Sequence, residues 1–95
     1  MPEKTSPSIL VLDDEPAIRF VLVEVLRDSG YIVSSAADAA EALRLLGSAA
    51  FDLVISDIVM PDMSGTEFLK RARAASPEVE VILITGLPDT ASAIE

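Results

Sequence analysis

The sequence contains neither cysteine nor histidine. Without cysteine the chain can form no disulfide and no thiolate metal site, and the redox compartment is left open. Without histidine it lacks the side chain that most often serves as general base and as metal ligand. Any chemistry must therefore depend on carboxylates, hydroxyls, lysines and arginines.

Basic residues are also scarce: 7 Lys and Arg stand against 16 Asp and Glu, for a net charge of −9. A compact acidic domain repels phosphate backbones, so we expect no direct binding to nucleic acid. The apolar runs are far too short to span a membrane, and the opening MPEKTSPS has no apolar segment of a secretory signal. These absences predict a soluble cytoplasmic protein.

The length allows one domain at most, because the chain has 95 residues. Residues 1–7 are polar, contain two prolines and are expected to form a disordered tail. Residues 8–95 are expected to form the domain, and their hydrophobic content suffices for a modest core.

Short apolar runs alternate with segments of helical periodicity. The expected strands are residues 8–12, 31–36, 51–57 and 79–85. Continuous apolar runs suit strands of a parallel sheet that is covered on both faces. The second run contains Ser34 and Ser35, a polarity that suits a strand at the edge of the sheet.

The helices are marked by their start signals. Pro16 suits a first helical turn, and the pairs Asp38/Glu41 and Ser64/Glu67 have the spacing of a capping box. A fourth helix is expected to begin within the final six residues, TASAIE. The first helix should present one apolar stripe, made of Ile18, Val21, Leu22, Val25 and Leu26. The βα alternation predicts an α/β fold with a parallel sheet and right-handed crossovers.

Carboxylates follow two of the expected strands at the point where each strand ends. Asp13 and Asp14 follow the first strand, Asp57 closes the third, and Thr85 closes the fourth. The carboxyl ends of parallel strands lie on one edge of a sheet, where ligands bind. We therefore expect these side chains to converge there, although they are far apart in the sequence.

Carboxylates brought together repel each other, by roughly 4 kcal/mol for a pair 4 Å apart at an effective dielectric constant of 20. A proton or a cation relieves that repulsion. Oxygen ligands without histidine or cysteine select Mg²⁺ or a similar hard divalent ion. A carboxylate beside such an ion could attack phosphorus to form an aspartyl phosphate, and the added charge could move the Thr85 hydroxyl and its loop as a switch.

Each residue also has an ordinary structural explanation. Asp13 and Asp14 could cap the following helix, Asp57 could cap a turn, and Thr85 could simply end a strand. The convergence of all of them at one end of different strands is harder to explain in that way.

Three segments, ILVLDDEP, DLVISDIVMPDMSG and VILITG, resemble the receiver domain of two-component response regulators. The resemblance runs from about Ser8 to the last residue. It implies a flavodoxin-like, CheY-like open parallel sheet with strand order 2-1-3-4-5.

The resemblance also implies roles for individual residues. Asp57 corresponds to the phosphoacceptor, which a sensor histidine kinase loads. Asp14 corresponds to the direct Mg²⁺ ligand, and Asp13 to the acid that holds metal-bound water. The main-chain carbonyl of Val59 corresponds to a third protein ligand, and Thr85 to the switch hydroxyl.

The sequence departs from the family pattern at its end. The family continues with a fifth strand that carries a lysine and with a fifth helix, whereas this sequence ends at Glu95, and neither Lys4 nor Lys70 takes the lysine's place. We therefore expect a C-terminally incomplete receiver with strand order 2-1-3-4, which phosphorylates and switches poorly alone. Its fourth strand would be an exposed apolar edge that favours a homodimer or a strand-swapped oligomer.

The leading hypothesis is a phosphoacceptor signalling module that changes a partner-binding surface, and not an enzyme with an outside substrate. The alternative is a receiver that acts by dimerisation without phosphorylation. An aspartate-nucleophile phosphatase is a weaker hypothesis, because such enzymes usually carry a second acid at the position of Val59. The sequence contains no P-loop and no GxGxxG motif, so nucleotide binding is a still weaker hypothesis.

Overall fold

The computed structural model describes residues 6–57 and 62–84. Strands and helices alternate along these residues, as the sequence predicts. The elements are β1 (Ser8–Leu12), α1 (Pro16–Asp28), β2 (Ile32–Ala36), α2 (Ala39–Ser48), β3 (Leu53–Asp57), α3 (Gly65–Ala75) and β4 (Glu80–Ile84). The fourth helix expected from the sequence lies outside the described residues.

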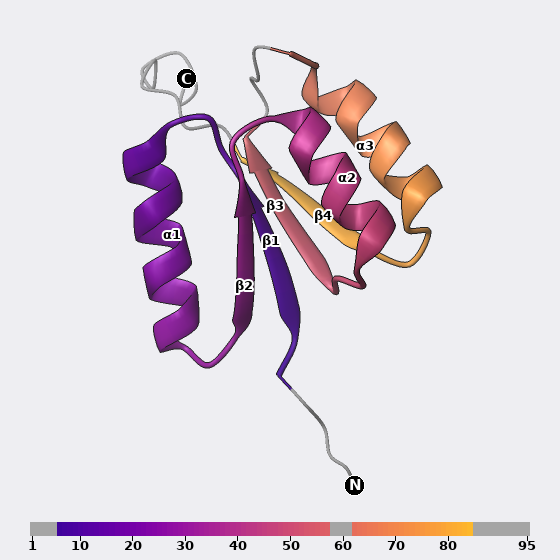
Figure 1. Ribbon diagram of the computed structural model, residues 1–95. Helices are drawn as coiled ribbons and strands as arrows, with labels where there is room; N and C mark the ends of the chain where they lie inside the picture. The colour runs from indigo at the N-terminus through magenta and orange to yellow at the C-terminus, as the bar shows by residue number, and fades with distance from the viewer. Residues whose placement is uncertain (1–5, 58–61, 85–95) are drawn as a thin grey trace, which may run out of the picture.

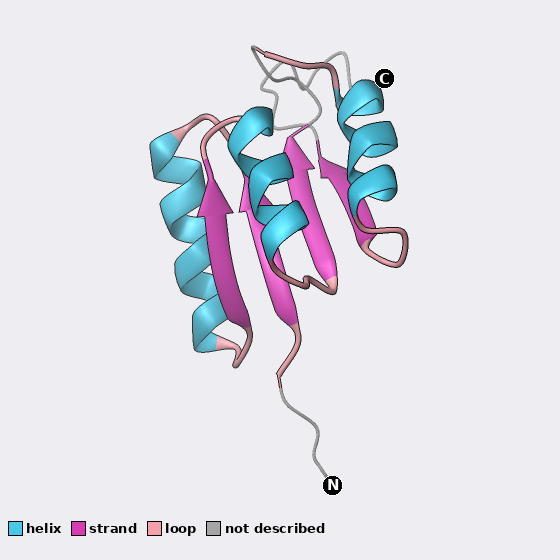
Figure 2. Ribbon diagram, turned by 45° about the vertical axis from the view of Figure 1, so that its right-hand side comes forward, coloured by secondary structure: helices cyan, strands magenta, loops and turns pink. Residues whose placement is uncertain are grey.

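The strands form one parallel sheet of order β2-β1-β3-β4, which confirms the expected order. Helix α1 covers one face of the sheet, while α2 and α3 cover the other (Figures 1 and 2). Among the described strands β2 and β4 are outermost, so the polar second strand does lie at an edge. Because β1 and β3 are central neighbours, the residues that follow them are brought together.

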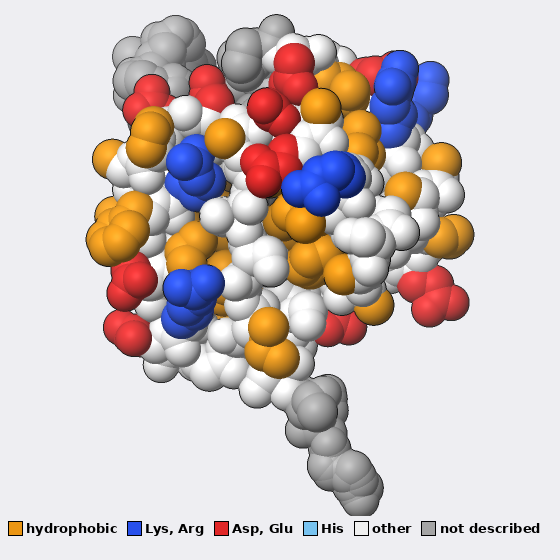
Figure 3. Space-filling view, in the orientation of Figure 1, with side chains coloured by type: hydrophobic (Ala, Val, Ile, Leu, Met, Phe, Trp, Pro, Cys, Tyr) orange, Lys and Arg blue, Asp and Glu red, His pale blue; other side chains and the backbone are white. Residues whose placement is uncertain are grey.

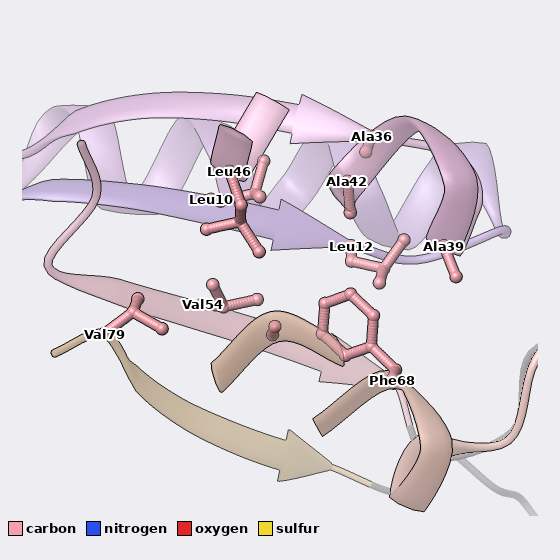
Figure 4. Packing of buried hydrophobic residues seen from close by; sticks show 10 residues of the cluster. Leu10, Leu12, Ala36, Ala39, Ala42, Leu46, Val54, Phe68 and Val79 are labelled. Atoms are coloured by element: carbon pink, nitrogen blue, oxygen red, sulfur yellow. The ribbon is translucent and has the colours of Figure 1, made fainter. Parts of the chain in front are cut away.

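The larger core lies between the sheet and the helices α2 and α3 (Figure 4). Phe68 is its largest fully buried side chain, and Figure 4 shows its ring beside Leu12. The other buried members are Leu10, Leu12, Ala36, Ala39, Ala42, Leu46, Val54, Ala72 and Val79. This cluster packs on Leu10 and Leu12 of β1 and on Val54 of β3 from one side of the sheet.

The core under α1 is smaller, and the expected apolar stripe of this helix is only partly covered. Leu22 and Leu26 pack with Val23 against the buried β1 and β2 residues, which are Ile9, Val11 and Val33. Val21 and Val25 are each 56% exposed, and none of the residues of α1, all of which are described, is buried. Of the predicted apolar stripe, only Leu22 and Leu26 therefore pack against the sheet.

The helix starts follow the sequence signals, with one difference. The Asp38 carboxylate accepts the Glu41 N–H at 2.8 Å, and the Ser64 hydroxyl accepts the Glu67 N–H at 3.1 Å. The reciprocal half of a capping box differs, however. The Glu67 carboxylate accepts a bond from Arg71 at 2.8 Å instead. The Glu67 carboxylate therefore bonds to the Arg71 side chain and not to the backbone at the helix start.

Within the described part of the chain, every helix is too short or too polar to cross a bilayer.

Candidate metal centre

The acids that the sequence places at two strand ends meet in the structure. Strands β1 and β3 pair in register, with Leu12 opposite Ser56. The next residues therefore stand at the same level: Asp13 follows β1, and Asp57 is the last residue of β3. One carboxylate oxygen from each of Asp13, Asp14 and Asp57 lies within 4.8 Å of the others. Figure 3 shows Asp and Glu side chains gathered at this end of the molecule.

Asp13 is held firmly from several directions. Its side chain is buried, and one carboxylate oxygen accepts the Glu15 N–H at 2.9 Å. Its main-chain N–H donates to the Ala36 carbonyl of β2 at 3.3 Å. Its own carbonyl accepts a bond from the Arg19 guanidinium at 2.8 Å. The carboxylate is therefore positioned by β1, β2 and α1 together.

Helix capping does not explain the acid pair. The residue at the N-cap of α1 is Glu15, and within the described residues no side chain caps this helix. Asp13 bonds the N–H of the N-cap residue itself, and Asp14 is exposed. The ordinary structural explanation thus covers one hydrogen bond of Asp13 and leaves the gathering of the carboxylates unexplained.

The environment of Asp13 opposes its negative charge. Burial raises the pKa of this carboxyl above its ordinary value of 3.8. The bond from the Glu15 N–H works against that rise, while repulsion by Asp57 and Asp14 adds to it and the charge of Arg19 lowers it. The net direction is upward, so a cation placed among these oxygens would relieve a cost that the fold already bears.

The site is closed on one side and open on the other. Asp13 is buried, Asp57 is half-buried and Asp14 is exposed. Beneath them Ser56 is fully buried, and its hydroxyl donates to the main-chain carbonyl of Asp57 at 2.9 Å. A ligand would therefore approach from the side of Asp14 and Asp57.

These donors fit a hard divalent cation. The cluster offers carboxylate oxygens only, which suit Mg²⁺ and similar ions. A cation held by two or three of them would keep further positions for water or phosphate oxygens.

Two predicted site residues, Val59 and Thr85, lie outside the described residues, and their roles stay predictions. Two others were missed from the sequence. Arg19 reaches back across the start of α1 to Asp13. Asp62 follows the acidic strand end and accepts the N–H groups of Ala39 and Ala40 at 3.3 and 3.2 Å, so it ties this segment to the first turn of α2.

Their signals in the sequence were weak. Asp62 lies among turn-forming residues, and nothing local indicates a bond to residues more than twenty positions earlier. Arg19 is simply a basic residue in the first turns of a helix. Only the folded arrangement shows that both act around the strand ends.

Comparisons with known proteins agree with the geometry. The family model of the response regulator receiver domain matches residues 9–95. The response regulator receiver protein CpdR of Brucella abortus (strain 2308) is 37% identical over 78 residues, which are 82% of this chain and 65% of that protein. The chain spans 10% to 20% of the length of three further curated relatives.

Solved structures give the same result. A CheY-like receiver domain protein from Methanospirillum hungatei JF-1 matches with a TM-score of 0.83 and 34% identity, over 95% of this chain and 72% of that chain. The response regulator TrrA from Thermotoga maritima, crystallised in complex with Mg(2+)-BeF, matches with a TM-score of 0.79 and 41% identity, over 90% of this chain and 75% of that chain.

Proposed function

Since the chain belongs to the response regulator receiver family, we propose that Asp57 accepts a phosphoryl group from a sensor histidine kinase while neighbouring acids hold Mg²⁺. The observation that carries this proposal is the gathering of carboxylate oxygens from Asp13, Asp14 and Asp57 within 4.8 Å of one another. Family membership alone would not require these residues to meet in this chain.

Each acid has a distinct task in the proposal. Asp14 binds the metal directly, the buried Asp13 holds a metal-bound water, and the Val59 carbonyl supplies a third protein ligand. When bound, Mg²⁺ neutralises charge on the transferring group. The solved relative from Thermotoga maritima, which was obtained with Mg(2+)-BeF, supports this choice of ion.

The half-buried position of Asp57 suits a nucleophile. A carboxylate oxygen of Asp57 forms a bond to phosphorus while the bond from phosphorus to the histidine nitrogen of the kinase breaks, and its electron pair stays on that nitrogen. The buried Ser56 hydroxyl, which donates to the Asp57 main-chain carbonyl, holds the end of β3 in place during transfer. The exposed side at Asp14 leaves room for the donor.

Phosphorylation would then switch a partner-binding surface. The phosphoryl group adds charge at the strand ends, and the Thr85 hydroxyl donates a hydrogen bond to it. The bonds from Asp62 to Ala39 and Ala40 give a second route by which a change near Asp57 reaches α2. In this role the domain reports a state and turns over no outside substrate.

The alternative, a receiver that acts by dimerisation without phosphorylation, gains no support from the site. A module that never binds metal or phosphate has no need to hold Asp13 buried beside two further carboxylates, at an electrostatic cost. The phosphatase hypothesis stays weak, because Val59 occupies the position where such an enzyme would need a second acid.

Intact-mass spectrometry after incubation with acetyl phosphate tests the proposal. We expect a phosphoryl mass gain that requires Mg²⁺ and disappears in Asp57→Asn. The matched control is Asp52→Asn at the other end of the same strand segment, where the carboxylate accepts the Ser8 N–H at 2.8 Å. A mass gain that persists in Asp57→Asn, or that disappears in Asp52→Asn only, would refute the assignment.

A further inference from the structure

A groove runs between helix α1 and the outermost strand β2. It has a volume of about 350 Å³, and its lining includes Arg19, Phe20, Val23, Glu24, Arg27 and Ser35. Figure 3 shows Lys or Arg side chains over the region of α1 and β2, with hydrophobic side chains between them. In the expected strand order 2-1-3-4-5 a further strand lies beside β4, at the other side of the sheet, so β2 stays an edge and the groove stays accessible from that side.

Two arginines of the groove are held in place by main-chain carbonyls. The Arg19 guanidinium donates to the Asp13 carbonyl at 2.8 Å, and the Arg27 guanidinium donates to the Val33 carbonyl at 3.1 Å. Within the described residues neither arginine forms an ion pair, in contrast to the arginines of α2 and α3. Since a guanidinium group has five N–H donors, both can still bind a carboxylate.

The helix and the strands give the same separation for the two anchored groups. Arg27 follows Arg19 by just over two helical turns, which is about 12 Å along α1. The strand register places Asp13 one residue beyond the level of Ala36. Val33 lies about four residues before that level, or roughly 13 Å along the strand. The two carbonyls that anchor the arginines are therefore spaced like the arginines themselves.

The surface between the two arginines is apolar at its centre. Phe20 is 65% exposed, and the half-buried Val23 lines the groove beside it. The Ile32 N–H donates to the Pro7 carbonyl at 3.0 Å, so Ile32 faces β1. Alternation then turns the main-chain N–H and carbonyl of Ser35 away from β1, toward the edge of the sheet. The groove thus offers an apolar surface and backbone groups between two cations.

We infer that this groove binds an extended acidic segment of a partner protein, which carries carboxylates four residues apart and a large apolar side chain midway between them. An extended chain advances by about 3.3 Å per residue, so positions i and i+4 are about 13 Å apart, and i, i+2 and i+4 share one face. These three side chains match the two arginines and the apolar surface between them. The Ser35 main chain can exchange hydrogen bonds with the bound segment, as in other sites that take extended peptides.

Charge limits what the groove accepts. The net charge of −9 repels nucleic acid and long runs of acidic residues. A segment with two carboxylates, each placed on a guanidinium, avoids most of that repulsion. Glu24 also lines the groove and opposes an acid at the central position. The inference requires neither metal nor phosphoryl group and is independent of the proposed function.

Fluorescence anisotropy on the 95-residue chain, with chelator present, tests the inference. The probe is a short labelled peptide of threonine and glycine, with glutamate at its third and seventh positions and isoleucine at its fifth. Its matched isomer has the first glutamate moved to the fourth position, which turns that carboxylate to the opposite face. We expect saturable binding of the first peptide and binding of the isomer that is weaker by at least about tenfold.

A charge swap at one arginine examines the ionic contact. Arg27→Glu should weaken binding by at least about tenfold, and a peptide with lysine in place of one of the two glutamates should restore it. The matched control is Arg44→Glu on α2, which changes the net charge equally at a side chain that is 68% exposed. This control should leave binding unchanged, because Arg44 lies outside the groove.

Two further variants examine the centre of the groove, and circular dichroism confirms that all variants fold. Phe20→Ser should weaken binding by about tenfold, and Glu24→Gln should tighten it. Absence of saturable binding, equal binding of the two peptides, equal losses in Arg27→Glu and Arg44→Glu, or no restoration by lysine would each overturn the inference. So would displacement of the peptide by an equal concentration of free glutamate, or self-association of the chain that Arg27→Glu abolishes, since these would assign the groove to a small anion or to a second copy.

Discussion

Burial has opposite effects on stability in the middle of the central strands and at their carboxyl ends. Along β1 and β3, Leu10, Leu12 and Val54 are fully or almost fully buried in apolar surroundings, which stabilises the fold. Immediately beyond, Asp13 is also buried. Burial raises the pKa of its carboxyl, and repulsion by Asp57 and Asp14 adds to that rise. The apolar residues along these two strands therefore stabilise the fold, and the carboxylates at their ends destabilise it. The proposed metal site therefore lies directly beside the apolar core.

The helix starts lie at the same end of the sheet as the acids. Helices α1, α2 and α3 begin at the end of the sheet where β1, β2 and β3 finish (Figure 1). The amino-terminal end of a helix carries a partial positive charge, which favours carboxylates close to its first turn. This end of the sheet is therefore the one where helix dipoles are of the sign that favours negative charge.

The largest effect is expected in the core that packs on the central strands. Phe68→Ala removes the largest fully buried side chain, and we expect the free energy of unfolding to fall by about 3–5 kcal/mol. Since small domains are stable by only about 5–15 kcal/mol, this variant should be close to unfolding. Urea denaturation followed by circular dichroism measures the change. A loss below about 1 kcal/mol would show that the cluster under α2 and α3 is not the main core.

At the carboxyl end the same measurement should change in the opposite direction. Asp13→Asn keeps an acceptor for the Glu15 N–H but removes the buried charge. With chelator present, we expect the free energy of unfolding to rise, because the cost of burying the charge disappears and the repulsion by Asp57 and Asp14 is relieved. The stabilisation that Mg²⁺ gives to the wild-type chain should be lost.

The control for this variant is Asp52→Asn, at the far end of β3, which should alter neither quantity appreciably. If Asp13→Asn destabilised the metal-free chain, the acid cluster would be a source of stability and the contrast between strand body and strand end would be wrong.

A smaller effect separates helix capping from metal binding at the carboxyl end. Ser64→Ala removes the side chain that accepts the Glu67 N–H and should cost about 1 kcal/mol of stability. It should leave Mg²⁺ affinity, measured by calorimetric titration, unchanged. Glu15→Ala is the comparison, because Glu15 occupies an N-cap without a side-chain bond, and its effect should stay within about 0.5 kcal/mol.

The smallest effect is expected on the exposed side of α1. Val25→Ala should change the free energy of unfolding by less than about 0.5 kcal/mol, since Val25 is 56% exposed. Its neighbour Leu26 packs on Val33 in the smaller core, and Leu26→Ala should cost more than that. Equal losses for the two variants would indicate that both sides of α1 are covered.

Most of the fold could be predicted because its signals are local. Apolar runs alternated with capped helices, and the pair Ser34 and Ser35 identified an edge strand correctly. The extent of burial on α1 could not be predicted in this way. Helical periodicity marks an apolar stripe, but how far Val21 and Val25 are covered depends on what packs beside the helix.

The acids of the site could be predicted from topology, because parallel strands end on one edge whatever the details of packing. Asp13, Asp14 and Asp57 do meet there. The contacts of Arg19 and Asp62 could not be predicted. The Arg19 bond depends on the rotamer of a side chain in the second turn of α1, and the Asp62 bonds join residues from different connections. The competition of Arg71 for Glu67 also required the folded side-chain positions.

The bonds from Asp62 to α2 also bear on how the molecule opens. They join residues 22 and 23 positions apart and enclose β3 within the loop they close. The first turn of α2 can then fray only when the Asp62 bonds break, so amide deuterium uptake at Ala39 and Ala40 should follow release of the segment that contains Asp62. Exchange at these two amides would serve as a built-in reporter of that segment, readable without any label.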